Sequence, residues 1–423
     1  MTPRAHVPAD VLVVGGGPAG LATAIELARR DRSVTVVDQG APTADAARLL
    51  TPRAVAAARR LGFDPVERFH PIENVRFSVR DPQSPTVRST RTTWPSHRVY
   101  PDCGAAATRA ELVAALRAVA VEVGVELVDG HEAIEPLVER GFVRGARVRP
   151  VDAPDVVELR SRLTVVADGA GSRFGRLLGT FREPEWPVAS AHATEYPSPF
   201  HELGEVEIVL HVTDRAGTPI AGYGWMYPTG RGTVSVGIML ASTSPSYHVI
   251  NPANLLREFV KGERDRWRLD GGPVREASGT RIPLGSSVGP LAGPSWLIIG
   301  DAAASANPLT GLGLDTALES GIIAGDVIAE ALDTDSAATA LQRYPQLIDQ
   351  QYGAYYKVGR LADRLLGRPT IARRAYVAMA TRRRITDGAL RIATQHLRGG
   401  ARGSGPEFIY RTARAVSVFA PDA

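Results

Sequence analysis

The chain has 423 residues, 44% of them hydrophobic and 22% charged, which fits a globular protein of two joined domains. No stretch approaches the ~18 apolar residues of a membrane span, residues 1–10 lack the apolar core of a secretory signal, and a single cysteine excludes an intrachain disulfide. The lone cysteine fits a reducing compartment, so we expect a cytoplasmic protein. The net charge of +4 is not gathered into a basic patch interleaved with aromatics, so we expect no nucleic-acid partner.

The first element in the chain is typical of a dinucleotide site. Residues 10–17, "DVLVVGGG", form an apolar run that predicts a buried strand entering a glycine turn. A helix follows, and a second predicted strand, "SVTVVD", ends at Asp38. The turn has the G-x-G-x-x-G spacing at Gly15, Gly17 and Gly20. Such glycines let a pyrophosphate approach the backbone at a helix N-terminus, and the acid accepts hydrogen bonds from a ribose.

Two later strand-to-loop junctions extend this prediction. Residues 163–179 contain an apolar strand that ends at Asp168-Gly169, and residues 296–332 contain another that ends at Gly300-Asp301. The loop after the second strand contains Asn307, Pro308, Gly311 and Gly313, and a long helix of small residues follows it. Because the last junction lies far from the first motif, the nucleotide-binding domain is expected to resume after an inserted domain.

This layout resembles the FAD-dependent oxidoreductases of the glutathione-reductase-like superfamily, in the branch of aromatic hydroxylases (flavin monooxygenases), flavin halogenases and geranylgeranyl reductases. The resemblance implies an α/β fold: a Rossmann FAD-binding domain, an inserted antiparallel-sheet substrate domain and a C-terminal helical region. It also implies FAD contacts beyond the glycine turn, including Arg109 in "TRAELVAAL". The expected cofactor-binding residues are Gly15, Gly17, Gly20, Asp38, Arg48, Arg109, Asp168, Gly169, Gly300, Asp301, Pro308, Gly311, Leu312, Gly313 and Leu314.

The expected domain organisation has four parts. Residues 1–185 form the first part of the FAD-binding domain, and residues 186–285 form the substrate-binding sheet, because strand-like alternation and turns dominate there. Residues 286–335 return to the FAD-binding domain, and residues 336–423 supply C-terminal helices and a tail.

Alternating aromatics in the middle domain mark the candidate substrate pocket. Tyr223, Trp225 and Tyr227 occur within "AGYGWMYPTGRGT", so on a strand they share one face. This stretch resembles the Tyr-x-Trp-x-Phe-Pro signature of geranylgeranyl reductases and menaquinone side-chain reductases. Two interpretations stay open, a substrate wall beside the flavin and an aromatic stripe of the core.

Other residues depart from the prenyl reductase pattern. The segment before "LLTPRAV" (49–55) lacks the cysteine, lysine and glycine of those enzymes, and Arg48 there resembles the arginine of aromatic hydroxylases that contacts FAD. Leu312 stands where the reductases have a glutamate. No lysine precedes Lys261, which argues against halogenation. No metal-ligand spacing occurs in the sequence. No second dinucleotide motif occurs either, so we expect electrons to come from NAD(P)H that binds transiently or from a partner reductase.

Three functional hypotheses follow. The favoured one is a flavin monooxygenase that uses O₂ to hydroxylate or epoxidise an apolar prenylated or polyketide-like compound of secondary metabolism. The alternative is an FAD-dependent reductase of prenyl or polyene double bonds. The third is a lipid carrier or cyclase that uses the flavin fold without redox turnover.

The C-terminal helices raise the question of a membrane contact. Five arginines gather there, Arg373, Arg374, Arg382, Arg383 and Arg384. They could meet an anionic lipid surface and place the protein peripherally at a membrane. A solvated basic helix face explains the same pattern and is favoured.

Overall fold

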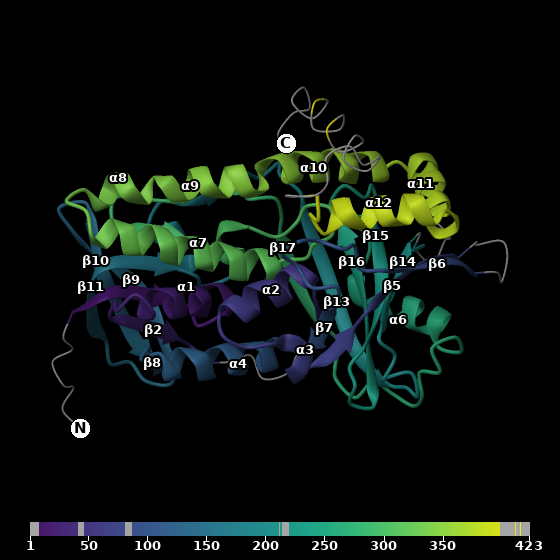
Figure 1. The fold of residues 1–423 in the computed structure, drawn as a ribbon, viewed down its shortest axis with the longest axis horizontal. Helices are drawn as coiled ribbons and strands as arrows, with labels where there is room; N and C mark the ends of the chain where they lie inside the picture. The colour runs from purple at the N-terminus through teal and green to yellow at the C-terminus, as the bar shows by residue number, and fades with distance from the viewer. Residues whose placement is uncertain are drawn as a thin grey trace.

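The computed structural model describes residues 8–40, 46–80, 87–210, 212–213, 220–397, 411 and 415. Two large sheets lie beside each other, and helices near the C-terminus form a layer along both (Figure 1). None of the helices in the described ranges is long and apolar enough to span a bilayer.

The first sheet is built around five parallel strands. In spatial order they are β8 (Glu126–Asp129), β2 (Val34–Asp38), β1 (Ala9–Val14), β11 (Val157–Val166) and β19 (Trp296–Ile298). The antiparallel strands β10 (Phe142–Pro150) and β9 (His131–Glu139) extend it from the first half of β11. In β1, Val11 and Val13 belong to one core cluster, whereas Leu12 and Val14 belong to another. Burial on both faces explains why the strand is an unbroken apolar run.

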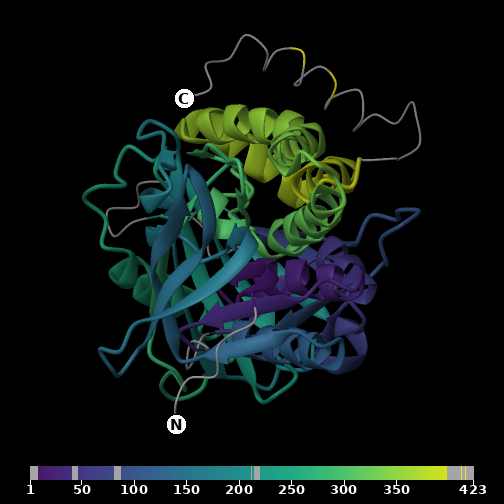
Figure 2. The ribbon, with the colours of Figure 1, turned by 90° about the vertical axis from the view of Figure 1, so that its left-hand side faces the viewer.

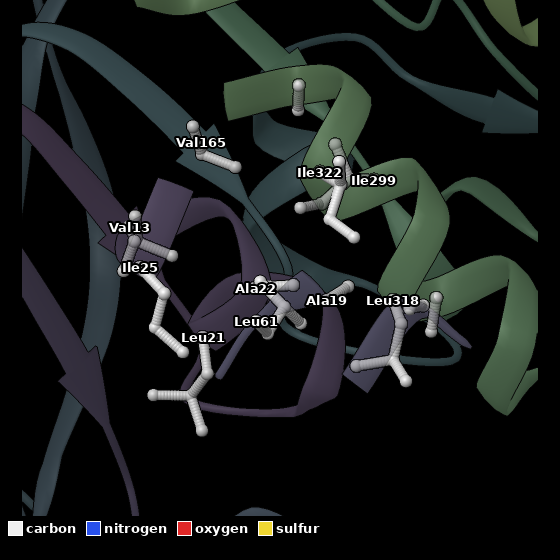
Figure 3. Close-up of a cluster of buried hydrophobic side chains, with 14 of the residues drawn as sticks. Val13, Ala19, Leu21, Ala22, Ile25, Leu61, Val165, Ile299, Leu318 and Ile322 are labelled. Carbon is white, nitrogen blue, oxygen red and sulfur yellow. The ribbon is translucent and has the colours of Figure 1, made fainter. Parts of the chain in front are cut away.

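One face of this sheet is covered by helices packed at close range. They are α1 (Pro18–Ala28), α7 (Leu314–Leu332), α4 (Arg109–Glu122) and α2 (Pro52–Arg60). Figure 3 shows α1 and α7 meeting through Ala19, Ala22 and Leu318. A Cβ atom on Gly321 of α7 would overlap the carbonyl oxygen of Ala19, so the small residues of α7 permit this approach. Strand β19 pairs with β11, so the chain returns to the first sheet after the strands of the second sheet.

The second sheet has seven strands. In order they are β17 (Ser278–Pro283), β13 (Val188–Pro197), β16 (Thr233–Ala241), β15 (Gly222–Pro228), β14 (Glu205–Leu210), β5 (Asn74–Arg80) and β6 (Val87–Thr93). Helix α6 (Pro252–Glu263) packs on β13 and β16. All neighbours are antiparallel except β14 and β5, which run parallel.

This sheet differs from the expected one in two respects. It is mixed rather than wholly antiparallel, and β5 and β6 come from within residues 1–185. The parallel pairing follows from the connectivity of the chain. A hairpin between β5 and β14 would force them to run antiparallel, but β5 comes from the nucleotide-binding part and no hairpin joins the two strands.

Small elements join the two sheets. A three-stranded sheet consists of β3 (Arg48–Leu50), β7 (Gly104–Ala107) and β4 (His70–Ile72). The remaining short elements are α3 (Pro65–Arg68), α5 (Arg173–Leu177), the pair β12 (Phe181–Arg182) and β18 (Val288–Gly289), and the 3₁₀ turn η1 (Gly300–Ala303). Strand β3 places Arg48 between the sheets.

The C-terminal region is helical, as expected. It comprises α8 (Ala337–Leu341), α9 (Arg343–Ile348), the π-turn η2 (Asp349–Gly353), α10 (Ala354–Leu366), α11 (Pro369–Thr381) and α12 (Arg383–Ala393). Helices α8 and α9 pack on α7, whereas α11 and α12 pack on β5 and β6. Figure 2 shows these helices together on one side of the molecule. The predicted tail lies almost wholly outside the described residues.

Candidate active site

The glycine turn lines a hollow at the carboxyl ends of β1, β2 and β11, here called the glycine hollow. Gly15 has a φ of +109°, and a Cβ there would overlap the Ala167 carbonyl, so only glycine fits. A Cβ on Gly20 would overlap the carbonyl oxygen of Gly15. Gly17 caps α1 without a side-chain hydrogen bond to the helix N–H groups. The turn therefore presents backbone donors to an anion, as the motif requires.

Three acids line the same hollow, and Glu132 is one of them. Asp38 ends β2, and its Oδ2 lies 3.8 Å from Nη1 of Arg117. Asp168 accepts a 3.1 Å hydrogen bond from the Phe174 N–H, which is a capping role at α5. Its other oxygen, Oδ1, is buried and has no partner in the described part of the chain. Burial raises the pKa of Asp168 above its ordinary value. Gly169 adjoins it with a φ of +85° but is not among the lining residues.

Arg109 connects this hollow to a second one. It starts α4 after Thr108, whose side chain forms a capping box with Glu111. Arg109 lines both hollows, and a Cβ on Gly17 would lie 3.3 Å from its Nη2. A guanidinium at the mouth of the glycine turn is suited to a pyrophosphate.

The second hollow, here called the aromatic hollow, lies between the two sheets. Its lining includes Arg48, and two side chains of the second sheet hold the segment before it. The Ala47 N–H donates to Glu195 Oε1 at 2.8 Å, and the Ser235 hydroxyl donates to the Ala47 carbonyl at 2.9 Å. Sequence reasoning missed Glu195 and Ser235, because a contact over 148 residues has no local pattern.

The loop before α7 forms the floor of the aromatic hollow. Gly311, Leu312, Gly313 and Leu314 all line it. Gly311 has a φ of +65°, and Gly313 caps α7 without a side-chain hydrogen bond. The N-terminus of α7 therefore lies at this hollow, where the Thr316 N–H donates to Asp315 Oδ1 at 2.9 Å.

Three other predicted residues lie near this floor but do not line it. Pro308 packs under α10, where a Cβ on Gly359 would lie 2.8 Å from Pro308 Cγ. Gly300 starts η1 with a φ of +59°. Asp301 follows it with its side chain still accessible, 3.2 Å from where a Cβ on Gly313 would lie. The enclosing protein raises the pKa of Asp301, an effect that Arg109 and Arg48 partly offset.

The three aromatics of β15 stand together in the aromatic hollow. The Tyr223 and Trp225 ring centroids are 6.0 Å apart, and the Trp225 and Tyr227 rings stack at 5.7 Å. The Tyr223 hydroxyl donates to the Thr310 carbonyl at 2.5 Å. The indole N–H of Trp225 is buried and has no acceptor among the described residues. The three rings therefore lie on one face of β15, and the same rings also pack against the core.

A third space, here called the apolar cavity, adjoins the aromatic hollow and has a volume of about 420 Å³. It is walled by β5, β14, β15 and helices α10 to α12. Leu49, Tyr223, Tyr227, Met239, Thr310 and Leu312 line both spaces. Sequence reasoning did not identify this cavity. One sequence pattern could have indicated part of its wall. Apolar residues recur every four positions along α11, at Ile371, Ala375 and Met379, and so share one face of that helix.

A buried ion-pair network braces the start of α7 beside the aromatic hollow. Arg53 of α2 is wholly buried and contacts Asp315 at 3.2 Å and Glu319 at 2.5 Å. Its Nη1 also donates to Gln395 Oε1 at 2.9 Å, just beyond α12. The motif "LTPRAV" contains Arg53, but only the fold shows that it ties α2, α7 and the C-terminal region together.

These features fit a bound FAD. The glycine hollow offers a backbone cradle with three acids, and Arg109 leads to an aromatic hollow that lies at a helix N-terminus. Two buried polar atoms, Asp168 Oδ1 and Trp225 Nε1, are left for a ligand. Fold and site together define an FAD-dependent oxidoreductase with an apolar cavity beside its aromatic hollow.

Comparisons with known proteins agree with this class. The FAD binding domain family model matches residues 8–347. Menaquinone reductase of Mycolicibacterium smegmatis is 34% identical over 371 residues, 85% of each chain. Digeranylgeranylglycerophospholipid reductase 2 of Methanopyrus kandleri is 28% identical, with 84% of this chain and 86% of that one covered. The chain belongs to the FAD binding domain family and to the superfamily that joins geranylgeranyl reductases with aromatic hydroxylase-like flavoenzymes.

Solved structures support the same fold. A geranylgeranyl bacteriochlorophyll reductase-like protein of Thermoplasma acidophilum has a TM-score of 0.69 at 20% identity, covering 98% of this chain and 96% of that one. A flavin-dependent brominase has a TM-score of 0.74 at 17% identity, covering 98% and 100%. At these identities the likeness concerns the fold alone.

Proposed function

We propose that this protein reduces a carbon–carbon double bond in an isoprenoid or polyene chain. The observation that supports this most is the apolar cavity, which shares Tyr223 and Tyr227 with the aromatic hollow where we place the flavin. A long unsaturated chain fits such a wall, and the relatives named above are reductases by their names. This order reverses the preference drawn from the sequence, in which a monooxygenase came first.

Reduction of a double bond requires a hydride and a proton. When bound, reduced FAD supplies the hydride. Tyr227 is our choice for holding the proton, because it lines both spaces and the rise that burial causes in the pKa of its phenol is partly offset by Arg48 nearby. The hydroxyl therefore stays protonated. Tyr223 has its hydroxyl committed to Thr310, and the apolar lining around both excludes water from the reacting carbon.

Electrons must reach FAD from outside the chain. The sequence has one dinucleotide motif, and the glycine hollow that it forms is assigned to FAD. We therefore expect the electron donor to be either NAD(P)H that binds transiently or a separate reductase.

The test uses the FAD-loaded protein, reduced without oxygen and mixed with geranylgeraniol, whose only reducible groups are its carbon–carbon double bonds. Flavin oxidation by the substrate and a product heavier by two hydrogens would support the proposal. Flavin that stays reduced, with every chain recovered unchanged, would overturn it.

A monooxygenase is the second candidate. The residues that line the aromatic hollow include no cysteine but do include Leu312 and Arg48. In these respects the hollow departs from the prenyl reductase pattern, and Arg48 resembles the arginine of the aromatic hydroxylases. Admitting O₂ to the same mixture separates the two, because a product that gains one oxygen would favour oxygenation. A protein that holds no FAD even after FAD is added back would favour the non-redox carrier or cyclase.

A peripheral membrane contact belongs to the same proposal. Helix α11 and strands β5 and β6 enclose a groove, here called the basic groove, lined by Arg80, Arg88, Arg373, Arg374 and Arg382. Arg80 pairs with Glu263, whereas the other four make no ion pair within the described ranges. Arg383 and Arg384 are exposed on α12 but lie outside the groove.

The groove and the apolar cavity share α11, and Ile371 of the cavity lining is 37% exposed. We therefore expect an anionic lipid surface to dock here and to deliver an apolar substrate. Arg373→Gln with Arg374→Gln should lower sedimentation with phosphatidylglycerol vesicles several-fold. Arg147→Gln with Arg149→Gln on β10 is the charge-matched control. Equal sedimentation of both double variants would contradict the expectation.

A further inference from the structure

One residue of the apolar cavity stands apart in its chemistry. Asp363, on the inner side of α10, is the only charged residue among those that line the cavity. It is 5% exposed, and its Oδ2 is buried without a hydrogen-bond partner in the described part of the chain.

The neighbours of Asp363 do not neutralise it. Arg364 follows it on α10 but makes no ion pair with it among the described residues, and Arg364 Nη2 is itself buried and unpartnered. The Thr243 hydroxyl lies near enough to the carboxyl to lower its pKa as a hydrogen-bond donor, although the two make no hydrogen bond of normal geometry. The Tyr376 ring of α11 is the other group that faces it. Burial raises the pKa of Asp363 to about 6, and Thr243 and Arg364 offset this only in part. An unsatisfied buried carboxyl is unfavourable unless a partner arrives.

We propose that Asp363 is the anchor for a hydroxyl group on an otherwise apolar, chain-like substrate. The inference rests on the proposed function, because it takes the apolar cavity as the substrate site. A carboxyl oxygen with a free lone pair accepts a hydrogen bond from an alcohol, and nothing else in the cavity offers a charge.

The position of Asp363 sets the direction of the substrate. Asp363 lines the cavity but not the aromatic hollow, whereas Tyr223 and Tyr227 line both. A chain held by its hydroxyl at α10 therefore extends its double bonds toward the tyrosines. Asp363 thus determines which substrates bind and how far along the cavity the chain lies, and it takes no part in the chemical step.

The experiment compares two probes of the same chain, geranylgeraniol and its methyl ether. The ether has no hydroxyl proton to donate. Binding to the FAD-loaded protein is followed by the change in the flavin spectrum and by calorimetry. We expect the wild-type protein to bind the alcohol roughly ten-fold more tightly than the ether, the scale of one buried hydrogen bond.

Three variants make the comparison decisive. Asp363→Leu should bind both probes equally and the ether at least as well as wild type does. Asp363→Asn keeps an acceptor and should retain part of the preference, which also provides a result if the leucine variant does not fold. Asp349→Leu removes an exposed acid outside the cavity and should keep the full ratio.

Each outcome has one meaning. An alcohol preference that survives in Asp363→Leu, or that is absent from the wild type, overturns the anchor while leaving the proposed function intact. Failure of both probes to bind any variant overturns the proposed function and the anchor with it.

Discussion

At the scale of single residues, Tyr227 occupies the boundary between the aromatic hollow and the apolar cavity. Tyr227→Phe keeps the ring and its stacking on Trp225 but removes the proton that we assign to the reaction. Loss of a general acid lowers rates by about 10²-fold or more. We therefore expect single-turnover flavin oxidation by substrate to slow by that factor, with substrate affinity nearly unchanged.

The matched control for this prediction is Tyr223→Phe. Its hydroxyl donates to Thr310 and so is engaged in holding the loop. A rate in Tyr223→Phe that falls as far as in Tyr227→Phe, or an unchanged rate in Tyr227→Phe, would remove Tyr227 from the role of proton donor.

Arg53 tests the buried network. Arg53→Ala leaves Asp315 and Glu319 without their cation in a site where the arginine side chain is 0% exposed. Breaking a buried pair on one side destabilises a protein by about 3–5 kcal/mol. We expect urea unfolding to show a loss of this order.

The comparison for Arg53 is an exposed arginine of the same helix. Arg59 pairs with Asp64 at 2.7 Å but is 44% exposed, so Arg59→Ala should change the free energy of unfolding by about 0–1 kcal/mol. Similar losses in the two variants would show that the Arg53 network does not stabilise the fold.

At the scale of elements, the junction of β1 and α1 depends on contact between two backbones. A Cβ on Gly20 would overlap the carbonyl oxygen of Gly15, so Gly20→Ala must push α1 away from the turn. We expect the purified variant to lose most of its FAD, measured as the ratio of flavin to protein absorbance, and to unfold at a lower temperature.

Gly124→Ala is the control for the junction. Gly124 follows α4 with a φ of +88°, and no atom lies within 4 Å of its Cβ position. The substitution should cost about 1 kcal/mol of backbone strain and leave FAD content unchanged. Full FAD content in Gly20→Ala would refute the packing argument.

Elements with a local pattern were the ones that the sequence could predict. The glycine turn, the acid at the end of β2 and the shared face of the aromatics all follow from spacing within about 30 residues. The pairing of β5 with β14 joins segments far apart in the chain, and so does the hydrogen bond from Ala47 to Glu195. Such contacts depend on the closed fold, so Glu195, Asp363 and the cavity wall had no recognisable pattern.

At the scale of the whole molecule, the end of the described C-terminal region docks onto residues 97–100. His396 is 1% exposed and lies against the rings of His97 and Tyr100. Burial, together with Arg53 and Arg391 nearby, lowers the pKa of His396 to about 3, and the backbone of Thr394 offsets this only partly.

A depressed pKa in the folded state has a definite consequence for stability. The neutral form is favoured by folding, so the stability from His396 is fully present above pH 6.5 and falls as pH decreases toward 3. Replacing it by a residue that does not titrate, as in His396→Asn, should flatten this dependence.

We expect urea unfolding to show a wild-type loss between pH 7 and pH 5 that exceeds that of the variant by on the order of 1–2 kcal/mol. Parallel pH profiles of the two proteins would exclude His396 as the cause.

The parallel pairing of β5 with β14 limits how this protein could be recombined. A chimera that imports residues 186–285 from a relative would bring a new β14 but keep the resident β5 and β6, so the imported β14 would have to pair with a β5 from another protein. The apolar cavity would be split in the same way, because Val75 and Phe77 come from β5 and Ile208 from β14. Exchange of substrate preference between relatives therefore requires residues 74–93 to be transplanted together with the later segment.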